Sequence, residues 1–167
     1  MAEFFERLEP EHRRFIEAQH VFFVGTAAPT GRVNVSPKGM DSLRVLDPDL
    51  VCWLNLTGSG NETAAHLRES PRMTLMFCAF DRQPLILRIY GTATAVHEGE
   101  AGWQERIGRF PEHSSARQVF DLRVELVQTS CGFAVPRYDF VGERDTLDRL
   151  WRQHDPEAVR RYWRERN

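Results

Sequence analysis

The sequence predicts a mainly β protein, in which six antiparallel strands form a closed or partly closed barrel of Greek-key type with helices outside it. Six apolar or alternating runs are separated by short turn sequences, which is typical of antiparallel sheets. Only three or four segments have helical periodicity. At 167 residues the chain has the length of one domain, so we expect a single domain over residues 1–167.

The order of elements follows from periodicity and turn residues. An N-terminal helix is expected over residues 10–19, because proline is tolerated in the first turn of a helix. The predicted strands cover residues 20–27, 32–39, 50–56, 72–80, 85–96 and 120–126. Shorter helices are expected at 61–69 and 99–109, and a helical tail at about 143–166, broken near Asp155-Pro156. The tail is rich in aromatic residues, which indicates that it packs on the barrel or on a second subunit.

The strand over residues 32–39 has two distinct faces. Val33, Val35 and Pro37 alternate with Asn34, Ser36 and Lys38. The pattern predicts a half-buried strand with Lys38 on its polar face. Lys38 is the single lysine in a chain that has 21 arginines. A lysine ammonium is a compact charge whose pKa shifts on burial, so Lys38 is a candidate for a functional role.

Composition excludes several classes of protein. The formal net charge of −2 argues against a nucleic-acid-binding protein, which usually carries a basic excess. The longest apolar runs are too short to cross a bilayer, and the charged N-terminus lacks a signal-peptide core. We therefore expect a cytoplasmic protein that binds a small-molecule substrate and neither nucleic acid nor membrane.

Cysteine and histidine spacing gives no sign of a metal site. Cys52, Cys78 and Cys131 form no CxxC pair, and the six histidines form no HxH or HxxxH pair. We expect Cys52 and Cys78 to lie in the core. Cys131 follows small polar residues and could be exposed, but no histidine stands beside it as a base. No side chain is assigned a catalytic role.

Residues 57–63, with the sequence TGSGNET, join an apolar strand to a helix. A glycine-rich turn before a helix presents backbone N–H groups that can bind phosphate. Ser59 and Glu62 have the spacing of a capping box, which would start the helix without any ligand. Both readings can hold together, but a phosphate site would need a cation from elsewhere. Lys38, Arg72, Arg88 or an arginine of a second chain could supply it.

Four ordered segments resemble the pyridoxamine 5′-phosphate oxidase-like family, the FMN-binding split barrels. They are residues 21–27 (VFFVGTA), 31–39 (GRVNVSPKG), 64–73 (AAHLRESPRM) and 89–93 (IYGTA). The resemblance implies a split barrel, bound FMN, and a homodimer with two sites at the subunit interface. Each site would use residues from both chains.

The resemblance also implies a set of cofactor-binding residues. It places residues 34–39 beside the flavin ring, the turn at 57–63 around the phosphate, and the region near residue 130 close to the partner's cofactor. Arg88, on the polar face of its strand, is a further candidate. The expected set is Asn34, Ser36, Pro37, Lys38, Thr57, Gly58, Ser59, Asn61, Thr63, Arg88, Ser130 and Cys131. The chain departs from the family where Asn61, Glu62 and Thr63 occupy positions that hold Arg and Lys in many members, and where Ile86 replaces a glutamine.

Three functions are compatible with these residues. The first is an FMN-dependent oxidoreductase, in which the flavin carries the chemistry and the protein supplies binding and electrostatics. The second is the same barrel with a deazaflavin or haem, since the turn has no cation of its own. The third is a non-catalytic dimeric protein that binds a flavin or another small molecule, which fits the lack of catalytic side chains.

Overall fold

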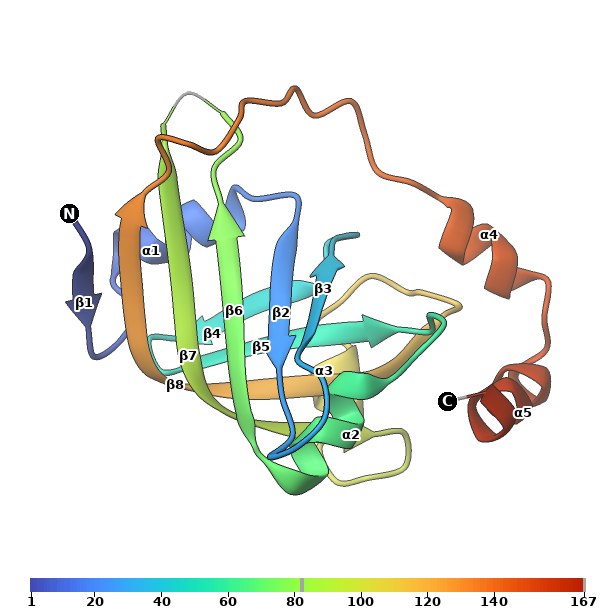
Figure 1. The fold of residues 1–167 in the computed structure, drawn as a ribbon. Helices are drawn as coiled ribbons and strands as arrows, with labels where there is room; N and C mark the ends of the chain where they lie inside the picture. The colour runs from blue at the N-terminus through green and yellow to red at the C-terminus, as the bar shows by residue number, and fades with distance from the viewer. Residues whose placement is uncertain (82, 167) are drawn as a thin grey trace.

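The computed structural model describes residues 1–81 and 83–166, and Figure 1 shows their arrangement. The strands are β1 (Glu3–Phe5), β2 (Phe22–Thr26), β3 (Asn34–Lys38), β4 (Leu43–Asp47), β5 (Leu50–Leu56), β6 (Arg72–Cys78), β7 (Leu85–His97) and β8 (Ala116–Cys131). The helices are α1 (Pro10–Glu17), α2 (Glu62–Glu69), α3 (Trp103–Ile107), α4 (Thr146–Arg152) and α5 (Pro156–Arg166). The prediction of a mainly β chain with flanking helices is confirmed.

The eight strands of the described residues belong to one curved antiparallel sheet. Its order is β3-β2-β6-β7-β8-β5-β4, and β1 pairs with β8 beside that path. No ladder joins β3 to β4 among the described residues, so the sheet is open where a closed barrel would continue. The prediction of six strands was wrong, because β1 has only three residues and β4 is a short run interrupted by Arg44.

The two longest strands are joined by a ladder that contains one bulge. Tyr90 pairs with Leu126 and Gly91 pairs with Val124, so Glu125 is an extra residue on β8. A Cβ atom at Gly91 would lie 1.9 Å from the Arg123 carbonyl oxygen, so glycine is required there. Beyond the bulge, the alternation of buried and exposed side chains along β8 is shifted by one residue. Leu126, which the sequence pattern places on the apolar face, is therefore exposed, and Val127 is buried.

The core fills the concave side of the sheet. Trp53 of β5 is fully buried and stacks on Phe120 of β8, with ring centroids 4.6 Å apart. A second, smaller cluster includes Trp103 of α3 and Phe110. Cys52 and Cys78 are both buried, as predicted. Burial raises the pKa of the Cys52 thiol to about 11, so this group stays protonated and inert.

The helix boundaries are close to the predicted ones, apart from α3, which is shorter than residues 99–109. The break in the tail lies between α4 and α5, at Asp155-Pro156 as expected. The capping box was wrong, however. Helix α2 begins at Glu62 with Asn61 as its N-cap, and no side chain caps its N-terminus.

The C-terminal segment crosses the molecule. After β8, residues 132–145 arc without regular structure over one end of the sheet and lead to α4 and α5 (Figure 1). The longest described helix is α5, with 11 residues. None of the helices in the described residues has the length and apolar character needed to span a bilayer.

Candidate functional site

A polar cleft lies between β3, the end of β5 and the beginning of α2. Its volume is about 190 Å³. Seven of the twelve expected cofactor-binding residues line it, together with four others. The lining residues are Asn34, Ser36, Lys38, Asn55, Leu56, Gly58, Ser59, Gly60, Asn61, Glu62 and Thr63. The fold thus brings the strand at residues 34–38 and the glycine-rich turn together, although about 20 residues separate them in the chain.

Strand β3 turns its polar side chains toward this cleft and its apolar ones outward. Val33 and Val35 are 72% and 64% exposed, whereas Asn34, Ser36 and Lys38 are partly buried. The sequence pattern alone favours the opposite arrangement. Strand β3 is an edge strand that pairs only with β2 among the described strands, so its outer side has no neighbouring layer within the chain.

Lys38 carries the positive charge of the cleft. Its ammonium lies 5.6 Å from the ring centroid of Trp53. Burial lowers the pKa of Lys38, and the nearby carboxylate of Glu62 partly opposes this shift. Within residues 1–81 and 83–166 the ammonium has no hydrogen-bond acceptor and no ion-pair partner. A partly buried ammonium without an acceptor favours an anionic ligand.

A network of amide side chains shapes the turn. The side-chain carbonyl of Asn61 accepts hydrogen bonds from Gln118 Nε2 at 2.7 Å and from Asn55 Nδ2 at 3.3 Å. Asn61 therefore ties the turn to β5 and β8 instead of capping α2. Asn34 Nδ2 donates to Thr63 Oγ1 at 3.2 Å, which links β3 to the same helix. The hydroxyl oxygen of Ser36 is buried and has no partner among the described residues.

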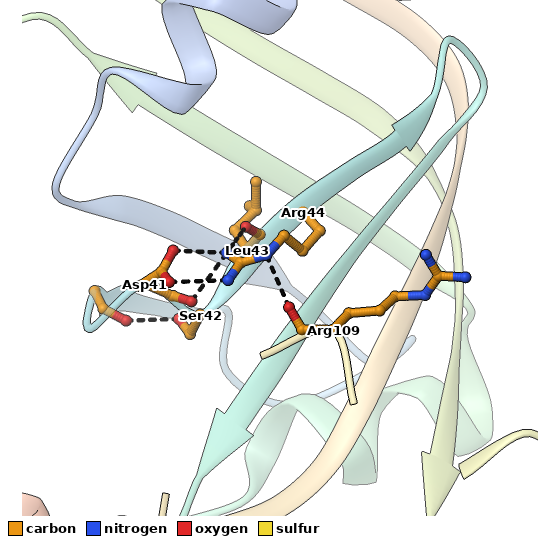
Figure 2. A network of polar contacts seen from close by, with 6 residues as sticks. Asp41, Ser42, Leu43, Arg44 and Arg109 are labelled. Atoms are coloured by element: carbon orange, nitrogen blue, oxygen red, sulfur yellow. Dashed lines mark hydrogen bonds and ion pairs between the residues drawn. The ribbon is translucent and has the colours of Figure 1, made fainter. Parts of the chain in front are cut away.

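The chain immediately after Lys38 is held by a second network, shown in Figure 2. Arg44 donates to both carboxylate oxygens of Asp41, at 2.6 and 2.9 Å, and to the carbonyl oxygen of Arg109 at 3.0 Å. Ser42 Oγ donates to the Gly39 carbonyl oxygen at 2.6 Å. Met40 and Asp41 have positive φ angles of 60° and 53°. These contacts fix a tight turn, and so they fix the end of the strand that carries Lys38.

A larger apolar cavity adjoins the polar cleft at Lys38, which lines both. Its volume is about 970 Å³. Residues 138–144 of the segment after β8 form one wall, and the ends of α1 and β3 form the other. The ring of Phe140 stacks on His20 with centroids 3.6 Å apart. The two cavities together offer an apolar space beside a polar one, with the ammonium of Lys38 where they meet.

The remaining expected residues lie outside the polar cleft. Pro37 lines the apolar cavity. Thr57 is fully buried, and its hydroxyl donates to the Ser115 carbonyl oxygen at 2.9 Å. Arg88 and Ser130 face the convex side of the sheet, where the guanidinium donates to Ser130 Oγ at 3.3 Å. Cys131 is exposed at the end of β8. Within one chain these last three residues do not meet the cleft.

Sequence reasoning missed several residues that build the site. Asn55 and Gln118 hold the turn through Asn61, but neither belongs to a recognisable motif. The tail was expected to pack on the barrel or a partner, and it packs on Thr57. Trp151 Nε1 donates to the Thr57 carbonyl oxygen, and Trp163 Nε1 to its hydroxyl, each at 2.9 Å. In the described part of the chain no three His, Cys, Asp or Glu side chains are grouped as metal ligands.

The residues that line the cleft lie within the part of the chain that matches a known protein family. The family model described as pyridoxamine 5′-phosphate oxidase matches residues 8–131. The chain belongs to the pyridoxamine 5′-phosphate oxidase family. It is also 41% identical over 149 residues to the pyridoxamine 5′-phosphate oxidase family protein ustO of Aspergillus flavus. That alignment covers 86% of this chain and 59% of the fungal protein, so the chain spans less than two thirds of this relative.

Solved structures share the fold. A putative pyridoxamine 5′-phosphate oxidase from Lactobacillus delbrueckii has a TM-score of 0.58 at 22% identity, covering 74% of this chain and 94% of that one. HutZ, the haem storage protein from Vibrio cholerae, has a TM-score of 0.54 at 21% identity, covering 76% of this chain and 98% of that one. At these identities the similarity describes the fold.

The residues present fit an anionic group of low charge. Lys38 has no acceptor and Ser36 Oγ has no partner in the described chain, so both have capacity for a ligand. Glu62 limits that capacity, because its carboxylate lies over the turn. A Cβ atom at Gly60 would come within 2.5 Å of Glu62 Oε2. The described residues that line the cleft therefore contribute one ammonium and one carboxylate.

Proposed function

We propose that the chain is a flavin-dependent oxidoreductase, with FMN as the flavin that its family implies. The observation that carries the proposal is the partly buried ammonium of Lys38, which has no acceptor among the described residues and lies where a polar cleft meets an apolar cavity. A flavin nucleotide has the matching parts, a flat apolar ring and an anionic phosphate. The flavin supplies hydride and electron transfer when bound.

The side chains then act by binding and orienting. Lys38 neutralises the anionic group, and Ser36 Oγ donates a hydrogen bond to it. Asn61, held by Asn55 and Gln118, keeps the backbone N–H groups of the turn in place. Residues 138–144 limit the access of water to the apolar cavity. No side chain is required as an acid or base in this scheme.

We propose further that two copies form a homodimer through the convex face of the sheet. Apolar side chains lie exposed on several strands of that face, including Val35 of β3 at one edge of the sheet, Leu126 of β8 at 36% and Phe4 of β1, which pairs with β8, at 61%. An exposed apolar patch of this kind marks an interaction surface. Arg88 and Ser130 share this face. In the proposed dimer these two side chains of one subunit would lie closer to the cleft of the other subunit.

The test of the flavin proposal is an absorption spectrum. The purified chain is mixed with FMN, unbound FMN is removed by gel filtration, and the absorption spectrum of the protein is recorded. We expect a retained flavin band at about one per subunit. Bleaching by a reduced nicotinamide nucleotide, and recovery in air, would support an oxidoreductase over a carrier. A band that never bleaches with any reductant would support the non-catalytic alternative, and no flavin binding at all would contradict the proposal.

Haem is the second candidate, and one observation favours it. His20 lines the apolar cavity, which is large enough for a planar macrocycle, and histidine is a common haem ligand. The ring of His20 is stacked on Phe140, so haem binding would require that stack to open. Titration with haemin distinguishes the two candidates. A Soret band that is lost in His20→Ala would support haem.

A further inference from the structure

A third cavity lies on the other side of the glycine-rich turn. It is a groove of about 1080 Å³ bounded by α2, β7 and α5. Residues 59–62 line both this groove and the polar cleft, so the two are separated only by the turn. The polar cleft alone, at about 190 Å³, is smaller than typical cofactor sites of about 300–1,000 Å³. If the flavin ring lies in the apolar cavity, the cleft has room for little more than a phosphate, so any group beyond that phosphate would extend past the turn.

The groove is rich in arginine. Its arginines come from α2, β8 and α5, and they are Arg68, Arg117, Arg160, Arg164 and Arg166. Three carboxylates, Glu62, Glu98 and Glu100, also line it, so positive charge prevails. Arg160 pairs with Glu98 at 3.2 Å, and Arg164 with Glu157 at 2.7 Å. Arg68 is exposed, and in the described part of the chain it has no acceptor.

An aromatic side chain completes the wall. The guanidinium of Arg117 lies 5.2 Å from the ring centroid of Trp163, and the side chain of Arg117 is largely buried. The indole of Trp163 is held by its hydrogen bond to Thr57 Oγ1. The groove thus combines fixed cations with an aromatic ring, which are the groups that bind phosphates and bases.

The net charge of the polar cleft distinguishes between a phosphate monoester and a phosphate diester as its ligand. Lys38 and Glu62 together contribute no net charge there. A phosphate monoester carries about −1.5 to −2 at pH 7, because its second pKa is about 6. A phosphate diester carries a single negative charge and has no second proton to lose. The neutral cleft therefore suits a diester better than the terminal phosphate of FMN.

We propose that the cofactor is a flavin whose phosphate is esterified onward to a further anionic group, which crosses residues 59–62 and lies in the arginine-lined groove. This inference rests on the proposed flavin function and replaces FMN, the flavin that the family implies, with a larger flavin nucleotide. Three observations support it: the small cleft, its balanced charge, and the cationic groove that continues from its rim. A flavin dinucleotide is the probe of this class.

The experiment compares three flavins on the full-length chain. Riboflavin, FMN and FAD are titrated separately, and dissociation constants are obtained from the change in flavin fluorescence. We expect FAD to bind at least about tenfold more tightly than FMN, which is the effect of one additional charge-assisted contact. Glu62→Gln should tighten FMN about tenfold and change FAD less, because it restores a net positive charge to the cleft.

A groove variant tests where the extension lies. Arg68→Gln combined with Arg160→Gln should weaken FAD about tenfold and leave riboflavin and FMN unchanged. Arg152→Gln is the matched control, since Arg152 is exposed on α4 and does not line the groove. Circular dichroism checks that each variant is folded.

The outcomes separate the inference from the function on which it rests. Equal affinity for FMN and FAD would overturn the inference and leave the flavin function standing. Tighter FAD binding that the groove variant does not weaken would remove the groove from the site, and so would overturn it too. If riboflavin, FMN and FAD all fail to bind, the proposed function itself fails.

Discussion

Lys38 differs from an ordinary surface lysine in its surroundings. Its ammonium lies near the ring of Trp53, and no acceptor for it exists among the described residues. Burial lowers its pKa from 10.5, because the charged form loses hydration. An anion bound beside it would favour the charged form again. Binding of an anionic cofactor and protonation of Lys38 are therefore linked.

The linkage predicts how FMN affinity depends on pH. The affinity for FMN should be greatest below the lowered pKa of Lys38 and should fall as the pH rises through that value, before pH 10.5.

Lys38→Met should weaken FMN binding about 10- to 100-fold at pH 7, since a charged hydrogen bond contributes about 1.5–3 kcal/mol. Fluorescence titration from neutral to alkaline pH measures both effects.

Arginine provides the matched control. Lys38→Arg keeps a charge that does not titrate in this range, so its affinity should stay level where that of the unmodified chain falls. If Lys38→Met bound FMN as tightly as the unmodified chain, Lys38 would have no place in the site.

The C-terminal tail contacts the glycine-rich turn at Thr57 and at Gly58, whose carbonyl oxygen accepts a hydrogen bond from the Tyr162 hydroxyl at 3.5 Å. Thr57 receives hydrogen bonds from Trp151 and Trp163, and it is adjacent to the Gly58–Asn61 turn. His113 Nδ1 lies 3.0 Å from a carboxylate oxygen of Asp148, which attaches α4 to the loop before β8. The tail thus supports the turn from outside while the amide network supports it from within.

Trp163→Phe should therefore loosen α5. The change keeps an aromatic ring but removes a hydrogen bond with a net contribution of about 0.5–1.5 kcal/mol. Amide hydrogens of α5 should exchange several-fold faster, and those of α1 should not change. Hydrogen exchange with mass spectrometry measures both helices in one sample. Unchanged exchange in α5 would show that packing, not this hydrogen bond, holds the tail.

At the scale of the whole molecule, the curved sheet separates two surfaces. The concave side holds the core, and the cleft opens beside its β3 edge. The convex side exposes apolar groups in register across strands, since Phe23 pairs with Pro37 on one side and with Met76 on the other. Strand β3 contributes to both surfaces, with Lys38 toward the cleft and Val35 outward.

Val35→Glu should therefore convert the proposed dimer to a monomer, because a charge would be buried in an apolar interface. Light scattering coupled to gel filtration measures the mass directly. Ala101→Glu, which adds the same charge to an exposed loop before α3, should remain dimeric. A monomeric unmodified chain, or a dimeric Val35→Glu variant, would contradict the assignment of this face.

The sequence by itself determined the features that depend on neighbouring residues. Alternation predicted most strands, Pro156 predicted the break in the tail, and four short segments carried the family resemblance. Such features are local, because periodicity and turn chemistry act over a few residues. The glycine-rich turn and Lys38 were recognised for the same reason.

Only the tertiary structure decided how these parts meet. Gln118 reaches Asn61 because β5 and β8 pair, and a separation of 57 residues leaves no local signal of that contact. The bulge at Glu125 exposed Leu126, and the edge position of β3 turned its valines outward. Trp151 and Trp163 reach Thr57 across about 100 residues. These contacts depend on strand order and register, which long-range packing sets and local pattern does not.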